Sequence, residues 1–171
     1  MKSRPFQQQG FTLIELVLYV AVIPIIVLPL SAFLLTNINS RIKHQTISEV
    51  EGEGMQVVQM IGQAVRNASA INAPPPQAFT TSLSLATANP ATNPTVFSLS
   101  SGGIFVSEGG GATVRLTSTH VTVSGLSFGN FSRSGTPGTV HFSFTVTYLN
   151  PEGRNEYSYA KTFYDSGTIR K

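Results

Sequence analysis

A run of uncharged residues near the N-terminus constrains this chain more than any other feature. Residues 16–35, LVLYVAVIPIIVLPLSAFLL, carry no charged side chain over 20 positions. As an α-helix rising about 1.5 Å per residue, this run would cover the roughly 30 Å hydrocarbon core of a bilayer. It is longer than the roughly 7–15-residue apolar region of a removable secretory signal, and residues 30–32 make a poor cleavage site. The sequence therefore predicts one membrane-spanning helix.

The charges on either side of the run predict its orientation. Lys2 and Arg4 precede it, so the positive-inside rule places the N-terminus in the cytoplasm and the rest of the chain outside. Arg41 and Lys43 follow the run and oppose this orientation without reversing it. We expect a single-pass protein of the cytoplasmic (inner) membrane with its N-terminus inside.

Two prolines, Pro24 and Pro29, lie inside the apolar run. Each removes a backbone donor and clashes with the preceding turn, which predicts a kink or a locally unwound stretch. One interpretation is a kink tolerated in the membrane. The other is a segment that melts when the helix leaves lipid, because the backbone groups freed by proline then need new partners.

An amphipathic segment at residues 36–72 is expected to continue the helix, to about Ala70. Apolar residues recur there at steps of three and four, with polar residues between them: Met55, Val58, Ile61, Val65 and Ala68. Gly52 and Gly54 predict a bend or break within it, since each costs roughly 1 kcal/mol relative to Ala.

The remaining residues, 73–171, predict a β-rich head with an antiparallel sheet, so the fold class is α+β. The clearest strand alternates apolar and polar residues over residues 140–148, which predicts one buried and one exposed face. A turn at residues 150–153 predicts a hairpin across residues 139–164, continued by Tyr157, Tyr159 and Phe163. Shorter candidate strands are residues 79–85, 96–99, 104–107, 113–116 and 121–128.

Composition argues against several classes of protein. Only 11% of residues are charged, against roughly 25% in soluble globular domains. The net charge of +3 forms no basic stripe, so we find no clear nucleic-acid site. The chain has no cysteine, which excludes disulfides and thiol nucleophiles. Its abundance of serine and threonine favours an extracytoplasmic head.

Candidate catalytic and metal-binding patterns are poor. His44, His120 and His141 lack the spacing of a metal motif. The sequence contains no nucleophile elbow, phosphate loop or dinucleotide fingerprint. We therefore expect no enzymatic activity, no catalytic residue, no metal and no cofactor.

One short motif stands at the start of the apolar run. Residues 10–15 are GFTLIE, and Glu15 sets a carboxylate inside an otherwise apolar membrane-entry segment. Burial of an unpaired charge costs several kcal/mol, so such a carboxylate needs a partner. A position at the headgroup boundary would be the simplest alternative.

The short basic leader followed by Gly10, Phe11 and Glu15 resembles the cleavage and assembly signal of type IV prepilins and pseudopilins. The resemblance implies that residues 1–10 are a leader peptide, cut between Gly10 and Phe11 by a prepilin peptidase that also N-methylates Phe11. It implies that residues 11–35 form a filament-core helix, which an inner-membrane assembly platform moves from membrane lipid into the filament. Glu15 would then face the Phe11 amine of a neighbouring pilin or pseudopilin subunit and dock the two together.

Two further stretches, residues 66–74 and 116–128, resemble J-type minor pseudopilins and related minor pilins. Pro24 and Pro29 depart from the single helix-weakening proline that the family commonly has farther along. The resemblance implies a structural subunit, a minor one, of a type IV pilus or type II secretion pseudopilus, assembled into an extracellular or periplasmic filament. The alternatives are a major pilin, or a membrane-tethered extracytoplasmic binding module or hydrolase.

Overall fold

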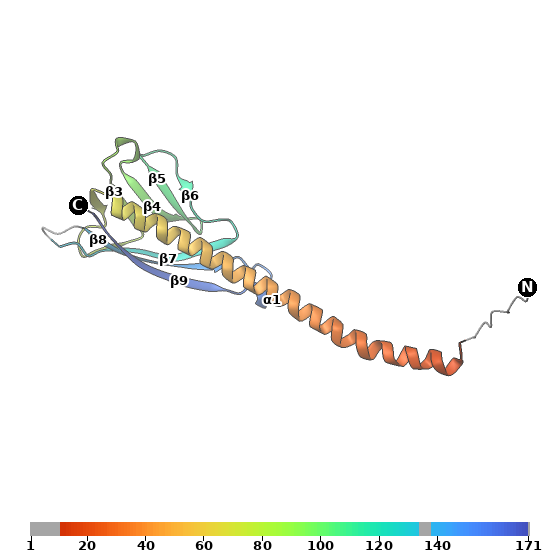
Figure 1. The fold of residues 1–171 in the computed structure, drawn as a ribbon. Helices are drawn as coiled ribbons and strands as arrows, with labels where there is room; N and C mark the ends of the chain where they lie inside the picture. The colour runs from red at the N-terminus through yellow and green to blue at the C-terminus, as the bar shows by residue number, and fades with distance from the viewer. Residues whose placement is uncertain (1–10, 134–137, 171) are drawn as a thin grey trace, which may run out of the picture. The chain divides into compact units, whose positions relative to one another are not determined.

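The computed structural model describes residues 11–133 and 138–170 (Figure 1). The chain divides into two compact units, Met1–Arg41 and Ile42–Lys171. Helix α1, Leu13–Asn67, contributes residues to both units, and the strands belong to the second. The predicted α+β fold, a long apolar N-terminal helix followed by antiparallel β-sheets, is confirmed.

Helix α1 is α-helical along its whole length, through both prolines and both glycines. The locally unwound stretch predicted at Pro24 and Pro29 is not present. The break predicted at Gly52 and Gly54 is also wrong. A helix propensity cost of roughly 1 kcal/mol per glycine is small beside the packing of a buried helical face.

The buried stripe of α1 agrees with the predicted one in part, since Ile61, Val65 and Ala68 are buried as expected. Met55 is 52% exposed and Val58 is only half-buried. Beside Ile61 and Val65, the stripe contains five helix residues that the pattern did not include: Thr46, Val50, Gly54, Val57 and Gly62. The sequence pattern missed the stretch before Ile61 because it treated the glycines as interruptions, although Gly54 is part of the packed face.

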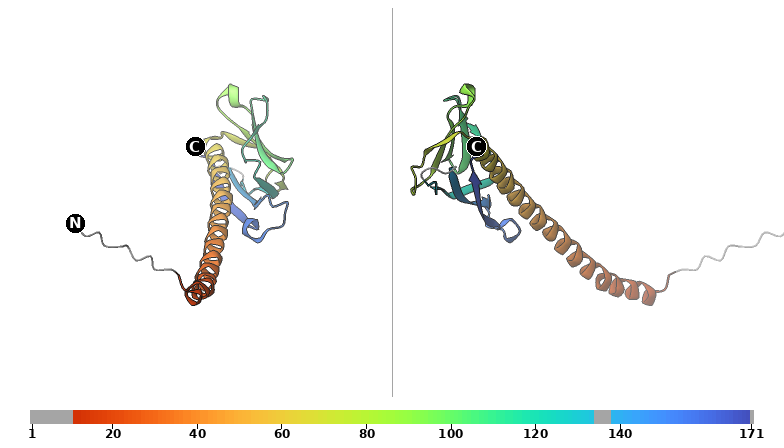
Figure 2. Two further views of the ribbon diagram at one scale, coloured as in Figure 1. Left: turned by 90° about the vertical axis from the view of Figure 1, so that its right-hand side faces the viewer. Right: turned by 60° about the vertical axis from the view of Figure 1, so that its left-hand side comes forward.

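Two glycines let the helix approach the strand β9, Ala160–Thr168. A Cβ on Gly54 would lie 2.1 Å from the ring of Phe163, and a Cβ on Gly167 would lie 2.9 Å from the Cβ of Val65. Each glycine thus faces a larger side chain on the other element. This exchange explains why the C-terminal part of α1 runs alongside the strands (Figure 2).

The strands form two antiparallel sheets. The five-stranded sheet has the order β1-β3-β4-β5-β6 and the four-stranded sheet the order β2-β7-β8-β9. The first comprises β1 Ala70–Ala73, β3 Ser82–Ala86, β4 Thr95–Ser100, β5 Gly103–Glu108 and β6 Val114–Arg115. The second comprises β2 Phe79–Thr80, β7 Val121–Asn130, β8 Thr139–Tyr148 and β9. Short 3-10 helices cover Pro90–Thr92 and Asn155–Tyr157.

The structure corrects two predicted boundaries. The helix ends at Asn67, and Ala70–Ala73 form β1, so the boundary between helix and head precedes the predicted residue 72. The single strand predicted over residues 79–85 is divided between β2 and β3, which lie in different sheets. At the division, the Thr80 hydroxyl donates a 2.6 Å hydrogen bond to the carbonyl of Ser82.

The predicted alternation along β8 is confirmed. Its apolar residues Val140, Phe142, Phe144 and Val146 are buried, whereas His141 is exposed. Strands β8 and β9 form the predicted hairpin, and the amide of Gly153 donates to the carbonyl of Asn150 within the predicted turn. Tyr157 and Tyr159 do not continue the strand, because the connection runs through a 3-10 helix before β9 begins.

The core of the second unit is one cluster that joins the helix stripe to both sheets. Leu83, Leu85 and Ile104 enter it from the five-stranded sheet. The rings of Phe144 and Phe163 stack within it, with centroids 5.5 Å apart. Residues 42–170 therefore bury a core of their own.

Candidate functional site

The N-terminal part of α1 is apolar on every side. Every large apolar side chain from Phe11 to Ile38 exposes between 40% and 82% of its surface. In the described residues, α1 is the one helix long and apolar enough to cross a membrane. A helix that is apolar all round needs apolar surroundings on every side, either a protein core or a membrane.

The polar side chains of this part form hydrogen bonds inside the helix. The Ser31 hydroxyl donates to the carbonyl of Val27 at 2.7 Å, and the Thr36 hydroxyl donates to the carbonyl of Ala32 at 2.9 Å. A hydroxyl bonded to the preceding turn needs no water. These side chains therefore do not oppose placement of the segment in lipid.

Glu15 lies in the first turn of α1, where a carboxylate interacts favourably with the helix dipole. The backbone amides of Glu15 and Leu16 donate to the carbonyl of Thr12, which begins the helix. The hydroxyl of Tyr19 donates to Glu15 Oε1 at 3.3 Å. This long contact with an exposed tyrosine leaves much of the carboxylate free to accept another donor.

Phe11 and Glu15 are brought near each other through Tyr19. The edge of the Phe11 ring approaches the Tyr19 ring with centroids 6.3 Å apart, and Phe11 is 76% exposed. Sequence reasoning missed Tyr19, although its position four residues after Glu15 places both on one helical face. Gly10, the other predicted cleavage residue, lies outside the described residues.

Pro24 and Pro29 lie within the exposed apolar stretch. Each lacks the amide that would donate to the carbonyl four residues earlier. Those carbonyls belong to Val20 and Ile25. The proposed melting of the helix at this stretch stays a prediction.

In the second unit, three glutamates bind α1 to the head. Glu49 Oε1 lies 2.9 Å from His120 Nδ1, and Glu53 Oε2 accepts a 3.1 Å hydrogen bond from the Ser118 amide. Glu51 Oε1 accepts a 2.6 Å hydrogen bond from Lys161 Nζ on β9. The segment EVEGEG, predicted as a break, therefore supplies polar contacts on both sides of the buried stripe.

The interaction between Glu51 and Lys161 shifts the pKa of both side chains. The hydrogen bond and charge of Lys161 lower the pKa of Glu51 below its ordinary value of 4.5, and the Tyr159 hydroxyl acts in the same direction. The hydrogen bond to Glu51 raises the pKa of Lys161 above 10.5. The two side chains are 45% and 42% exposed, so solvent weakens this pair.

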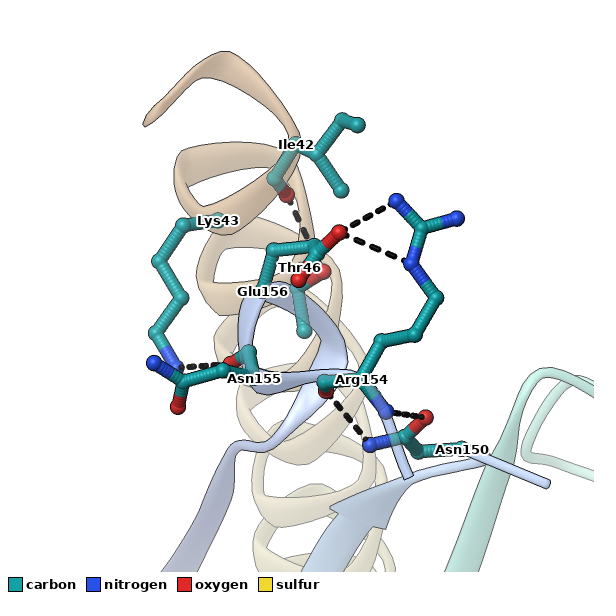
Figure 3. Close-up of polar contacts among 7 residues, drawn as sticks. All are labelled: Ile42, Lys43, Thr46, Asn150, Arg154, Asn155 and Glu156. Carbon is teal, nitrogen blue, oxygen red and sulfur yellow. Dashed lines mark hydrogen bonds and ion pairs between the residues drawn. The ribbon is translucent and has the colours of Figure 1, made fainter. Parts of the chain in front are cut away.

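The connection between β8 and β9 is fastened to α1 by Lys43 (Figure 3). Lys43 Nζ donates to the carbonyls of Asn155 at 3.2 Å and Ser158 at 2.7 Å. Within the connection, the Asn150 amide side chain bonds the backbone of Arg154 twice, at 2.7 and 3.0 Å. The Arg154 guanidinium pairs with Glu156, and this hydrogen bond raises the pKa of Arg154. These contacts are structural.

The three histidines occupy unrelated places. His120 contacts Glu49, whereas the His141 ring lies 4.6 Å from the Phe131 ring. Among the residues described, no group of three or more His, Cys, Asp or Glu side chains is arranged to hold a metal ion.

No family model, curated protein or solved structure matches this chain. The fold and the candidate site define a class by themselves: an α+β chain whose N-terminal helix exposes an apolar surface and whose second unit is a two-sheet head.

Proposed function

We propose that this chain is a structural subunit, of the minor type, of a type IV pilus or a type II secretion pseudopilus. A prepilin peptidase removes residues 1–10 and N-methylates Phe11. Before assembly the subunit resides in the inner membrane, with its head on the extracytoplasmic side. It then joins a filament through the N-terminal part of α1.

The observation that carries the proposal is the exposed apolar surface between Phe11 and Ile38. These apolar side chains are exposed, and an apolar surface of this extent needs surroundings without water. Lipid satisfies this surface before assembly, and the equivalent helices of other subunits satisfy it afterwards. Both surroundings exclude water, so transfer between them keeps the apolar side chains dry.

Glu15 gives the docking step its specificity. Glu15 is the sole acidic residue between Phe11 and Arg41, and its present partner is a tyrosine hydroxyl at 3.3 Å. The charged amine created at Phe11 of a neighbouring subunit is a complementary group. Pairing the two among apolar helices avoids leaving either charge unpaired.

The intact mass of the membrane-extracted protein tests the processing step. We expect loss of residues 1–10 together with a gain of about 14 Da for one methyl group. Gly10→Val should accumulate the unprocessed form, because a side chain would hinder close approach of the peptidase to the backbone. Gly52→Ala is the matched control, since a Cβ at that position meets nothing within 4 Å.

Other outcomes would change the conclusion. A membrane-extracted protein that keeps residues 1–10 and carries no added methyl group would contradict the proposal and favour a membrane-tethered binding module. If quantitative proteomics of purified filaments found this chain to be the dominant component, the protein would be a major pilin instead.

A further inference from the structure

The four-stranded sheet has an outer face that points away from the core. Along β8, His141 and Ser143 alternate with the buried Phe142 and Phe144. The register places Gly129 of β7 opposite His141. It places Ser127 of β7 and Tyr164 of β9 on the two sides of Ser143.

Aromatic side chains gather on this outer face. Phe79, Phe131 and Tyr164 are 66%, 49% and 77% exposed. Phe79 lies opposite Gly129, where an added Cβ would come within 2.5 Å of its ring. The Phe131 ring contacts both the Phe79 ring and the His141 ring, with centroids 5.7 and 4.6 Å apart. We call Phe79, Phe131, His141 and Tyr164 the aromatic patch.

A shallow hollow lies within the aromatic patch. Its volume is about 190 Å³, and Ser127, Gly129 and Ser143 help to line it. Pockets for drug-sized ligands usually measure about 300–1,000 Å³, so this hollow suits a single ring-sized group. The absence of a side chain at Gly129 helps to keep the hollow open.

Some hydroxyl groups of the outer face are paired across strands, and those beside the hollow are not. Thr145 bonds Thr162 at 2.8 Å, and Thr139 bonds Thr168 at 3.3 Å. Within the described residues, the side chains of Ser127 and Ser143 form no hydrogen bond, and neither does the Tyr164 hydroxyl. The hollow is therefore bordered by polar groups that can bond a ligand.

The strands present little charge on this face. Asp165 borders the hollow, but its Oδ2 lies 3.8 Å from the position of a Cβ on Gly62, toward α1. His141 and Asp165 are the histidine and carboxylate that line this hollow, whereas Arg133 lines a neighbouring hollow beside Phe131. Phosphates, nucleic acids and strongly charged peptides need cationic or anionic partners. A ligand of the hollow is expected to be neutral.

We propose that the aromatic patch binds a neutral oligosaccharide. A sugar ring has an apolar C–H face, which can pack on exposed aromatic rings, and a rim of hydroxyls, which can bond Ser127, Ser143 and His141. Exposed aromatic groups beside unpaired hydroxyls and with few charged neighbours suit this combination better than they suit a wholly apolar partner. The proposal is independent of filament assembly.

Isothermal titration of the full chain, in a micelle of a detergent without a sugar headgroup, tests the proposal. The probes are cellohexaose, chitohexaose, maltohexaose and xylohexaose, with a heparin hexasaccharide as the charged comparison. We expect at least one neutral probe to bind more tightly than heparin. The proposal is overturned if none of the four neutral probes binds, or if the heparin hexasaccharide binds more tightly than all of them.

Substitutions then locate the binding. Phe79→Ala and Tyr164→Ala should each weaken Kd about tenfold, equivalent to about 1.4 kcal/mol. Tyr164→Phe keeps the ring and should retain most of the affinity. Val114→Ala, at a 59% exposed position of the other sheet, is the matched control and should bind as wild type.

Two measurements separate binding from other effects. The unfolding temperature should not change in Phe79→Ala or Tyr164→Ala, because both side chains are largely exposed. Equal affinity in all variants would overturn the assignment. So would sedimentation velocity showing that the aromatic patch drives association of the chain with itself while sugar affinity stays unchanged.

Discussion

The two parts of helix α1 are stabilised by different surroundings. In residues 13–41 every side chain is exposed and the apolar ones point in all directions. In residues 42–67 one stripe, from Thr46 to Val65, is buried against the head. Helical geometry is common to both parts, but only the second finds its packing partners within the chain.

One continuous helix can therefore depend on different contacts for its stability in different parts of its length. The second part needs a specific surface, since Gly54 fits Phe163 and Val65 fits Gly167. The first part offers apolar area with one charge, Glu15, before its last residue, Arg41, and its apolar side chains can pack against lipid or against other helices. Under the proposed function, substitutions in the first part should therefore alter assembly, and those in the second should alter folding.

The largest effect is expected from Glu15→Leu. Under the proposed function, this change leaves a neighbour's Phe11 amine charged and unpaired, and breaking one half of a buried pair costs about 3–5 kcal/mol. Processing and membrane level should stay normal, because Glu15 lies beyond the cleavage site. The amount of protein in sheared filament fractions should fall steeply.

Tyr19→Phe is the matched control for Glu15→Leu. It removes the 3.3 Å hydroxyl contact with Glu15 but keeps the ring. Assembly should remain close to wild type. Normal assembly of Glu15→Leu would show that the carboxylate has no part in docking.

Ile61→Ala tests the second part of the helix. Ile61 is fully buried in the stripe, and such truncations cost about 2–5 kcal/mol of unfolding free energy. The neighbouring Met60→Ala, at a 42% exposed position, should change stability by no more than about 0.5 kcal/mol. Thermal unfolding followed by circular dichroism measures both losses of stability. Equal losses in the two variants would contradict the burial of Ile61 in the stripe.

Sequence reasoning succeeded where the pattern was local. The uncharged run of residues 16–35 and the alternation along β8 each depend on neighbouring residues alone, and both predicted the correct element. It failed at Gly54, because the fit of this glycine to Phe163 depends on a residue 109 positions away in the sequence. Local propensity cannot include such a contact.

Other features of the head also depend on distant residues. The ion pair between Glu51 and Lys161 joins residues 110 positions apart, and Lys43 contacts carbonyls more than 110 positions away. The division of residues 79–85 between two sheets has no proline or glycine to mark it. The aromatic patch was likewise missed, since β2, β7, β8 and β9 meet only in the folded sheet.

Gly54→Ala is expected to have a smaller effect than Ile61→Ala. The added Cβ would lie 2.1 Å from the Phe163 ring, and overpacking costs about 1–3 kcal/mol. Gly52→Ala places its Cβ in open space and should instead stabilise the helix by about 0.5–1 kcal/mol. The midpoint denaturant concentration of unfolding should therefore fall for Gly54→Ala and rise for Gly52→Ala, although the two glycines are only two residues apart.

A double substitution sharpens this result. Phe163→Leu removes the ring that the new Cβ meets, so Gly54→Ala should cost less in that background than in the wild type. Unchanged cost in the Phe163→Leu background would mean that Gly54 is required for another reason.

The smallest effect is expected from Lys161→Met, and it depends on pH. Glu51 has a lowered pKa in the fold, so its contribution to stability is present above its unfolded value and is lost as pH falls through the folded value, below 4.5. Lys161 has a raised pKa, so its contribution is lost as pH rises through the folded value, above 10.5. Lys161→Met removes the partner responsible for most of the Glu51 shift. The difference in unfolding temperature between wild type and Lys161→Met should be greatest between these limits and should shrink at both.

Lys161→Arg separates charge from packing in this last comparison. It keeps a cation beside Glu51, so its pH profile should stay nearer to that of wild type than the profile of Lys161→Met does. Added salt should reduce the difference in unfolding temperature between wild type and Lys161→Met. The Glu51 and Lys161 side chains are partly exposed, and mobile ions screen such pairs. A difference that persists unchanged at low pH and in high salt would arise from the apolar stem of Lys161, whose Nζ lies 5.6 Å from the centroid of the Phe163 ring. In that case the side chain would stabilise the contact between helix and head by packing, and the ion pair would contribute little.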